Sequence, residues 1–590
     1  MVKMSKNKKS LKRLSIIQFA SVIGIIFLLN IIISTFNFRV DLTEDHRYSL
    51  SENTIQLLKD ESKLKERIFF KVYLDGDLPA DMQQIRNSIR NVLDEFIAYS
   101  GDKIQYEFIN PSAESDDSYN RAVQEKIFNK GEGILPTYIN SMDADSKEQL
   151  IVWPGAIVEY GGQTVDVVQF FDREMIVLGE NVSNLVDKTI NDIEYKLISS
   201  IRRVTNVNPK SIGFLQGHGE LNENQTREVR TALKKDYRVG DIEINGQIQA
   251  LDEIDALIVA KPTTRFTEKD KFVIDQFIMK GGKVMWFIDP INVNLDSLAF
   301  TGETMGLSMD LNLQKDMLFK YGARVNNDIV IDEVSTHEFV PPKHIKAPGL
   351  AWIFYPLIQT GKHPIVNNLD PIKTEYTSSV VPVNSNDLAV KKTILLQSSP
   401  KSKSLMAPVR VNYGFAFEEY KPDFSNPKFG NNPIALLLEG EFTSPFENRL
   451  SPVFLNDSAY KTTFKSVPNK MIVVSDGDII DGSFIYYQQG KKKMSPIPLN
   501  IDRFNVMTKN GSPKFHYGNK EFILNSIDYL MGEDALISIR SKSISLRLLD
   551  DKKVKKEKSF WTTLNILVPI LTIFIFGFIL LFIRKRKYAK

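Results

Sequence analysis

The feature of this sequence that most restricts its fold is an uncharged apolar stretch near the end of the chain. Residues 560–583 read FWTTLNILVPILTIFIFGFILLFI, 24 residues without an acidic or basic side chain. A helix of this length rises about 1.5 Å per residue and therefore crosses the ~30 Å hydrocarbon core of a bilayer. A helix on the surface of a soluble protein would show a polar face, which this stretch lacks. The stretch predicts a transmembrane helix.

A second apolar run occupies residues 14–36, close to the start of the chain. It is longer than the apolar core of a signal peptide and lacks a small-residue cleavage site, so it predicts an uncleaved membrane anchor. A cleaved signal peptide is the alternative. Gln18 and Asn30 are the strongly polar residues of this run. Because amides inside a membrane favour hydrogen bonds between helices, both are candidates for docking on a partner helix.

The two ends of the chain are basic, whereas the body between them is weakly acidic. Residues 1–13 carry six cations and residues 584–590 carry five, with no acid in either tail. Without these tails, 64 basic and 72 acidic residues remain, a net charge of −8. Such a body argues against a nucleic-acid partner. Because basic flanks favour the cytoplasmic side, both termini are predicted there and residues 37–559 outside the cytoplasm. In a bacterium, this predicts an inner-membrane protein with a large periplasmic domain.

The residue types and motifs of the chain argue against several kinds of chemistry. The absence of cysteine excludes disulfides, thiol nucleophiles and cysteine-ligated metals. The sequence also lacks the G-x-x-x-x-G-K-[ST] phosphate-binding loop, the G-x-S-x-G nucleophile elbow and the H-E-x-x-H zinc motif. We therefore expect no enzyme activity, no catalytic residues, no cofactor and no metal. In particular, we expect no hydrolysis of ATP by this chain itself.

The region between the two apolar runs predicts an α/β protein with two extracytoplasmic domains. The first, residues 37–208, opens with a strand–helix–strand unit, which is typical of a parallel sheet. The second, residues 209–535, alternates buried strands with helices and has an irregular insertion at residues 300–390. A juxtamembrane linker is predicted at residues 536–559. Strands are predicted at residues 68–74, 104–109, 211–215, 256–260, 284–288, 393–396, 434–438 and 471–474, and helices include residues 81–99, 222–237 and 267–280.

Polar residues follow the predicted strands of the second domain. Open α/β sheets bind ligands beyond the carboxyl ends of their strands. The ligand-binding candidates at these positions are Gln216, His218, Glu220, Lys261, Asp289 and Asp476. Gly217 and Gly219 would let backbone approach a ligand closely, and His218 and Glu220 have the chemistry of an acid–base pair. Alternatively, these residues simply make turns, which favour Gly, Asp and Asn.

Seven segments give the chain a resemblance to a known family. They are DLTEDHRYSLSENT (41–54), GFLQGHGE (213–220), FVIDQFIMKGGKVMWFIDP (272–290), LFKYGARVNNDIVID (318–332), WIFYPLI (352–358), HPIVNNLD (363–370) and VVSDGDIIDGS (473–483). In the order and spacing of these segments, nearly end to end, the chain resembles the GldG family, the auxiliary membrane subunits of gliding-associated ABC transporters.

The resemblance implies that the ATPase and the main permease are separate polypeptides. It also implies that the second domain looks like class I glutamine amidotransferase-like folds. Those enzymes place a cysteine after a central strand, and this chain has none. The resemblance supplies no transported substrate and no catalytic residues.

The leading hypothesis is a non-enzymatic auxiliary subunit of an ABC transporter linked to gliding motility. Its helices would dock on an ABC permease that works with a separate cytoplasmic ATPase. Its periplasmic body would bind a substrate or an envelope protein or glycan. A structural tether for envelope motility or secretion machinery, without a transport role, is the alternative. A periplasmic hydrolase that uses His218 and Glu220 is the third hypothesis.

Overall fold

The structure is a computed structural model in which the chain forms two compact units, Met1–Ser543 and Ile544–Lys590. The predicted anchor at residues 14–36, including Gln18 and Asn30, lies largely outside the described residues. The structure describes isolated positions between residues 17 and 28 and then residues 49–113, 117–129, 133–140, 149–171, 182–338, 350–383, 390–416, 422–424, 430–447, 449, 462–488, 491–496, 498–501, 516–540 and 551–588.

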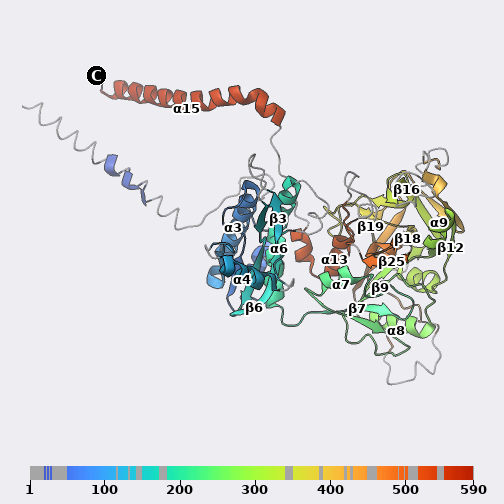
Figure 1. The fold of residues 1–590 in the computed structure, drawn as a ribbon. Coiled ribbons are helices and arrows are strands. Elements are labelled where there is room, and N and C mark those ends of the chain that lie inside the picture. The colour runs from blue at the N-terminus through green and yellow to red at the C-terminus, as the bar shows by residue number, and fades with distance from the viewer. Residues whose placement is uncertain are drawn as a thin grey trace, which may run out of the picture. The chain divides into compact units, whose positions relative to one another are not determined.

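A four-stranded sheet, in the order β2-β1-β5-β6, forms the first part of the larger unit. Figure 1 labels its edge strand β6 and the helix α3. Strands β1 and β2 pair in parallel and are connected through α3, which confirms the predicted strand–helix–strand unit. Strands β5 and β6 form an antiparallel hairpin beside β1. The bounds are β1 Ile68–Val72, α3 Ala80–Ser100, β2 Ile104–Phe108, β5 Gly155–Tyr160 and β6 Gln163–Gln169.

Helices cover both faces of this sheet. Side chains of α3 and α6 share one core with β1, whereas α4 packs on the other face. Ile68, Phe70 and Val72 of β1 are fully buried in the first core, because alternate side chains of a strand point to the same face. The bounds of the other elements here are α2 Glu52–Lys59, η1 Gly101–Lys103, α4 Asp117–Phe128, β3 Thr137–Asn140, β4 Gln149–Val152 and α6 Val182–Thr205.

A seven-stranded sheet forms the centre of the larger unit, in the order β19-β22-β23-β10-β9-β7-β8. Strands β8, β7, β9, β10 and β23 are parallel, and β22 runs antiparallel to β23 and β19. All six strands predicted beyond residue 209 lie in this sheet, whereas β8 was not predicted. The bounds are β7 Ser211–Gln216, β8 Arg238–Glu243, β9 Ala256–Ala260, β10 Lys283–Phe287, β19 Val390–Gln397, β22 Pro433–Gly440 and β23 Asn469–Val474.

The five parallel strands have a doubly wound topology. Numbered along the chain, they lie in the order 2-1-3-4-5, so the winding direction reverses between β7 and β9. In such sheets, the crevice at the carboxyl ends of the two strands flanking the reversal is the usual ligand position. This crevice is where the predicted residues at positions 216–220 and 261 are expected to meet.

Helices also cover both faces of the seven-stranded sheet. Helices α7 and α13 share one core with the sheet, and α8 with the short helices η3 and α10 shares the other. In β9, Ile258 faces the first core and Leu257 and Val259 face the second, which explains its continuous apolar run. Helix α7 is shorter than predicted. The bounds are α7 Arg227–Leu233, α8 Glu268–Met279, η3 Gln314–Leu318, α10 Phe319–Tyr321, η7 Asp478–Ile480 and α13 Asn519–Leu530.

Short strands occupy much of the region predicted as an irregular insertion. Several of them, including β11, β14, β16 and β21, pack around an aromatic core that includes Trp352, Phe354 and Tyr355. The bounds are β11 Ile291–Val293, α9 Leu295–Thr301, β12 Glu303–Ser308, β13 Ala323–Val325, β14 Asp328–Asp332, β15 Ser335–Glu338, β16 Leu350–Ile358, β17 Ile372–Lys373, β18 Val380–Pro382, β20 Ser402–Met406, β21 Val409–Asn412, η4 Tyr413–Ala416, β24 Ser483–Gln488 and β25 Lys491–Pro496.

Helix α14 (Asp534–Arg540) returns from the central sheet to the core of the first part. Its Leu536 and Ile539 are buried there, so the start of the predicted linker is a packed helix instead. The boundary predicted near residue 208 falls inside the larger unit. The fold is mixed α/β, and its division into two domains and its likeness to amidotransferases stay predictions.

Helix α15 (Asp551–Tyr588) belongs to the smaller unit and contains Pro569 (Figure 1). The most apolar 18 residues of its segment Lys558–Ile583 have a mean hydropathy of 3.0, and the segment is long enough to cross a membrane. Within the described part of the chain, this is the one helix that meets both conditions. It suggests membrane anchoring, whereas the second span and the orientation of the termini stay predictions.

Candidate functional site

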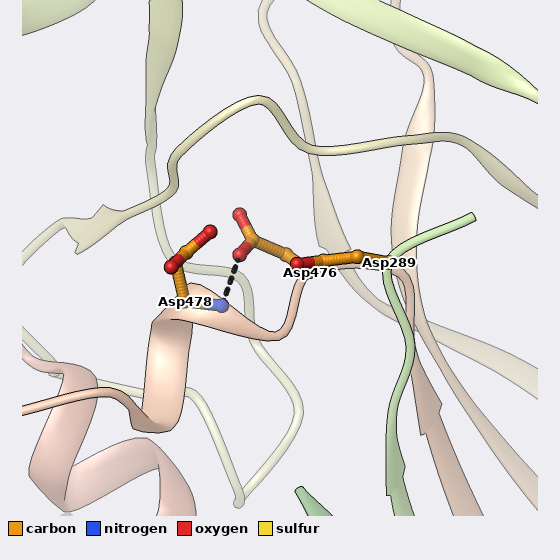
Figure 2. A group of neighbouring side chains, drawn as sticks. All are labelled: Asp289, Asp476 and Asp478. Carbon is orange, nitrogen blue, oxygen red and sulfur yellow. Dashed lines mark hydrogen bonds between the residues drawn. The ribbon is translucent and has the colours of Figure 1, made fainter. Parts of the chain in front are cut away.

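Four charged residues meet at the carboxyl edge of the seven-stranded sheet. Lys261 follows β9, Asp289 follows β10, and Asp476 and Asp478 follow β23. The Lys261 ammonium lies 3.3 Å from Asp289 Oδ2 and forms a second ion pair with Asp478. Figure 2 shows the three aspartates, whose carboxylate oxygens approach within 4.8 Å of one another. Three of the six predicted residues therefore come together, and Asp478 joins them.

Backbone N–H groups hold two of these aspartates in place. Asp289 Oδ1 accepts a hydrogen bond from the Gly477 N–H at 2.5 Å. Asp476 Oδ1 accepts one from the Asp478 N–H at 2.8 Å, drawn as a dashed line in Figure 2. The turn after β23 is thus folded around its own carboxylates, which is the bonding expected of aspartates in tight turns.

A segment of the inserted region, residues 374–379, crosses the end of β23. The Glu375 N–H donates to Asp476 Oδ2 at 2.9 Å, and the Ser378 N–H donates to the Ser475 carbonyl at 2.9 Å. Asp476 is fully buried beneath this segment. The strand end is therefore covered by the chain itself.

Burial and charge repulsion determine the protonation of this cluster. Burial raises the pKa of Asp478 to about 7, against the opposing attraction of Lys261. Burial, followed by the charges of Asp289 and Asp478, raises the pKa of Asp476 well above its usual range. For Lys261, burial lowers the pKa, but attraction to Asp478 and Asp289 outweighs it and raises the pKa overall. The cluster therefore retains a proton on its carboxylates at neutral pH and keeps its lysine charged.

The three carboxylates have the oxygen donors that Mg²⁺ or Ca²⁺ prefers. Here, however, the Lys261 ammonium already lies against Asp289 and Asp478 and supplies the positive charge. Both oxygens of Asp476 accept hydrogen bonds from backbone N–H groups. These carboxylate oxygens are therefore bonded to Lys261 and to backbone N–H groups, which fits a cluster neutralised by the protein itself rather than a metal centre.

His218 and Glu220 do lie together, but in a closed arrangement. His218 Nδ1 is 3.2 Å from Glu220 Oε1, and Nε2 is 3.3 Å from Asp270 Oδ2. The imidazole stacks on Phe266 at a centroid distance of 3.9 Å, and the residue is 5% exposed. Burial lowers the pKa of His218, but the bonds to Glu220 and Asp270 outweigh it and raise the pKa. A histidine with both nitrogens committed to carboxylates clamps its loop and is poorly placed to take a proton from a substrate.

The loops after β7 and β9 are also joined by backbone hydrogen bonds. The N–H groups of Thr263 and Thr264 both donate to the His218 carbonyl at 2.9 Å. Gly219 has a φ of +73°, and a Cβ there would lie 2.1 Å from Thr263 Oγ1. The sequence predicted that backbone would approach a ligand closely at Gly219. In the structure, this backbone instead approaches Thr263 of the loop after β9, across the crevice where the winding reverses.

Gln216 contributes to the same closure. Its Nε2 donates to the Leu221 carbonyl at 3.2 Å, and the Leu221 N–H donates to the Ala260 carbonyl at 2.9 Å. The six predicted residues therefore divide into two groups. Gln216, His218 and Glu220 fasten the crevice, and Lys261, Asp289 and Asp476 form the charged cluster.

Sequence reasoning missed three residues that complete these groups: Phe266, Asp270 and Glu375. Asp270 carried a signal, because it stands three residues after Thr267, the N-cap of α8, and its N–H donates to Thr267 Oγ1. Phe266 and Glu375 carried none, since their positions depend on how distant loops return to the sheet. The ligand-binding role of the six candidates stays a prediction.

Two family models match the chain. The model described as "ABC-type uncharacterized transport system" matches residues 209–526, which hold the seven-stranded sheet. A domain of unknown function, DUF7088, matches residues 44–159. No curated protein matches the chain.

Two solved structures share a remote likeness with the chain. One is titled "mmIFT52 N-terminal domain", with 13% identity, a TM-score of 0.30, and coverage of 54% of this chain and 97% of that one. The other is the exo-beta-1,4-mannosidase Op5Man5 from Opitutaceae bacterium strain TAV5, with 8% identity and a TM-score of 0.21. That match covers 67% of this chain and 46% of the mannosidase. At these TM-scores, neither likeness bears on fold or function.

Proposed function

Because the chain belongs to the ABC-type uncharacterized transport system family, whose model matches residues 209–526, we propose that it is a non-enzymatic auxiliary subunit of an ABC transporter. The family match is the observation that carries this proposal, and it supports a transport-associated accessory role. The resemblance to the GldG family extends the proposal to a transporter associated with gliding motility.

The proposed division of labour places ATP hydrolysis in a separate cytoplasmic polypeptide. The sequence lacks a loop that pairs a phosphate cradle with a lysine and a magnesium-binding hydroxyl. The apolar segment Lys558–Ile583 supplies a surface for docking on a permease in the membrane. Gln18 and Asn30 would add interhelical hydrogen bonds there.

The larger unit is proposed to bind a substrate or an envelope partner in the periplasm. The charged side chains at the strand ends are bonded to one another, which argues against catalysis there. His218 is committed to two carboxylates, and Lys261 is committed to Asp289 and Asp478. An acid–base catalyst needs a proton-transfer group that faces its substrate, and neither residue is arranged in this way.

Co-purification from native membranes tests the proposal. The full chain, tagged at its carboxyl end, is solubilised in mild detergent, and its partners are identified by mass spectrometry. We expect a multi-span permease and an ATPase. In a matched variant, residues 560–583 are replaced by a leucine-rich segment of equal length, which keeps the anchor but removes its specific surface. If docking uses this helix, the variant loses the permease.

Recovery of neither a permease nor an ATPase with the unmodified chain would overturn the transport role. Recovery of envelope motility or secretion proteins in their place would instead support a structural tether. The leucine-rich variant also separates the two docking modes, because retention of the permease would assign docking to the larger unit.

A further inference from the structure

A cavity of about 380 Å³ lies between the first part of the larger unit and its central sheet. Its walls come from α6 and β6 on one side and from α7 and α13 on the other. Six lysines and arginines line it against three carboxylates. Carboxylates outside the lining pair with three of these cations, so an anion would bind beside a cation that lacks such a partner.

The cations of this cavity differ in how they are neutralised. Arg203 pairs with Asp166 at 2.7 Å, and Lys520 pairs with Glu228 at 2.9 Å. Lys235 is an exposed residue, and no carboxylate among the described residues forms an ion pair with it. Desolvation, followed by repulsion from Arg203 and Lys520, lowers the pKa of Lys235. The cavity therefore holds a lysine among other cations, an arrangement that a bound anion would stabilise.

A buried hydroxyl gives a second, independent observation. Ser199 of α6 lines the cavity and is 2% exposed, and its Oγ has no hydrogen-bond partner in the described part of the chain. Helical serines commonly donate back to the carbonyl four residues earlier, and Ser199 does not. A buried polar group without a partner is destabilising, and a hydrogen bond to a ligand oxygen would remove this cost.

We propose that this cavity binds a phosphate group, carried by a soluble small molecule or by a lipid head group. Phosphate presents several strong acceptor oxygens, which suit converging ammonium and guanidinium groups and one hydroxyl. Lys235 would neutralise the ligand and Ser199 would donate a hydrogen bond to it. Because the cavity joins the two parts of the larger unit, binding would also hold these parts together. This inference does not depend on the transport role.

Calorimetry on the full chain in mild detergent tests the site. The probes are inorganic phosphate, glycerol 3-phosphate and dihexanoyl phosphatidylglycerol below its micellar concentration, each compared with chloride at equal ionic strength. At least one phosphate probe should raise the Tm and show saturable binding. Response to the two soluble probes alone indicates a soluble ligand, whereas response to the lipid probe indicates a head group.

Two variants assign the binding to this cavity. Lys235→Gln should weaken phosphate binding about tenfold, the effect of losing one charge-assisted hydrogen bond, without lowering the Tm of the ligand-free protein. Ser199→Ala should also weaken binding while leaving the ligand-free protein at least as stable. Lys234→Gln is the matched control, because Lys234 is exposed beside Glu223 and lies outside this cavity.

Wild-type chain that responds equally to chloride and to every phosphate probe overturns the proposal. Phosphate binding of unchanged affinity in Lys235→Gln also overturns it, since the anion would then lie elsewhere. Equal weakening by Lys234→Gln would indicate a general surface-charge effect, which contradicts a defined site.

Discussion

At the end of β23, one lysine is packed against two of three neighbouring aspartates. Buried ion pairs contribute little to stability, because desolvation offsets their attraction, but removing one partner leaves an uncompensated charge. The Lys261 ammonium is the cationic partner of both Asp289 and Asp478. The cluster is therefore a point at which single substitutions have large and pH-dependent effects.

Lys261→Met should destabilise the protein by about 3–5 kcal/mol at neutral pH, because it leaves the carboxylates of Asp289 and Asp478 without their cation. The loss should shrink at pH 5, because the pKa of Asp478 is raised to about 7 by burial and this carboxylate is protonated there. Urea unfolding at the two pH values measures both effects. The control is Lys280→Met, whose exposed pair with Asp252 should cost less than about 1 kcal/mol. Equal losses for the two variants would contradict a special role for Lys261.

Asp478→Asn should flatten the dependence of stability on pH. The pKa of Asp478 is raised from 3.8 to about 7 in the folded state, so the folded chain binds a proton that the unfolded chain lacks between these values. Wild-type stability therefore falls as pH rises through this window, and the variant loses that contribution. Unfolding free energies measured from pH 4 to pH 8 give both slopes. Parallel curves would show that Asp478 ionises normally, and Asp252→Asn should follow the wild type.

At the scale of elements, the strands that could be predicted from the sequence are those whose buried positions form a clear apolar pattern. Six of the seven strands of the central sheet were predicted, and those covered on both faces, such as β9, are apolar at every position. Strand β8 was missed since it lies at the sheet edge and most of its residues are exposed. The short strands of the inserted region were missed because each is stabilised by distant partners, as β14 is by β20.

The candidate site also has a part that could be predicted from local sequence and a part that depends on distant segments. Lys261, Asp289 and Asp476 could be predicted to converge, because parallel strands end at one edge of a sheet. The covering segment at residues 374–379 and the stacking of Phe266 on His218 could not, since neither leaves a local pattern. What the sequence missed is that the crevice is closed by the chain itself.

Helix α14 provides a test at this scale, because it carries two side chains into a core formed far away in the sequence. Leu536→Ala should cost about 2–5 kcal/mol by leaving a cavity in that core. Ser538→Ala, on the exposed side of the same helix, should cost less than about 1 kcal/mol. Thermal unfolding of both variants distinguishes a packed helix from a linker, for which the two losses would be equally small.

At the scale of the whole molecule, the larger unit and the apolar helix α15 have different solvents. The larger unit buries its apolar side chains, whereas no residue of the segment Lys558–Ile583 is buried within the protein. In water, such a surface would be costly, so a bilayer is its natural environment.

Deletion of residues 544–590 tests how many anchors the chain has. If residues 14–36 form a second span, the truncated chain should stay in the membrane pellet after alkaline extraction. Removing both segments should release it to the supernatant. Release by the first deletion alone would leave α15 as the only stable anchor and contradict the two-span prediction.

The central claim is that this chain assists an ATP-driven transporter without hydrolysing ATP. The most direct test is the ATPase rate of the permease and ATPase reconstituted in proteoliposomes, measured with and without the full chain, alongside the chain alone. The account predicts no hydrolysis by the chain alone and a several-fold change in the rate when it joins its partners. An unchanged rate, or ATP hydrolysis by the isolated chain, would contradict it.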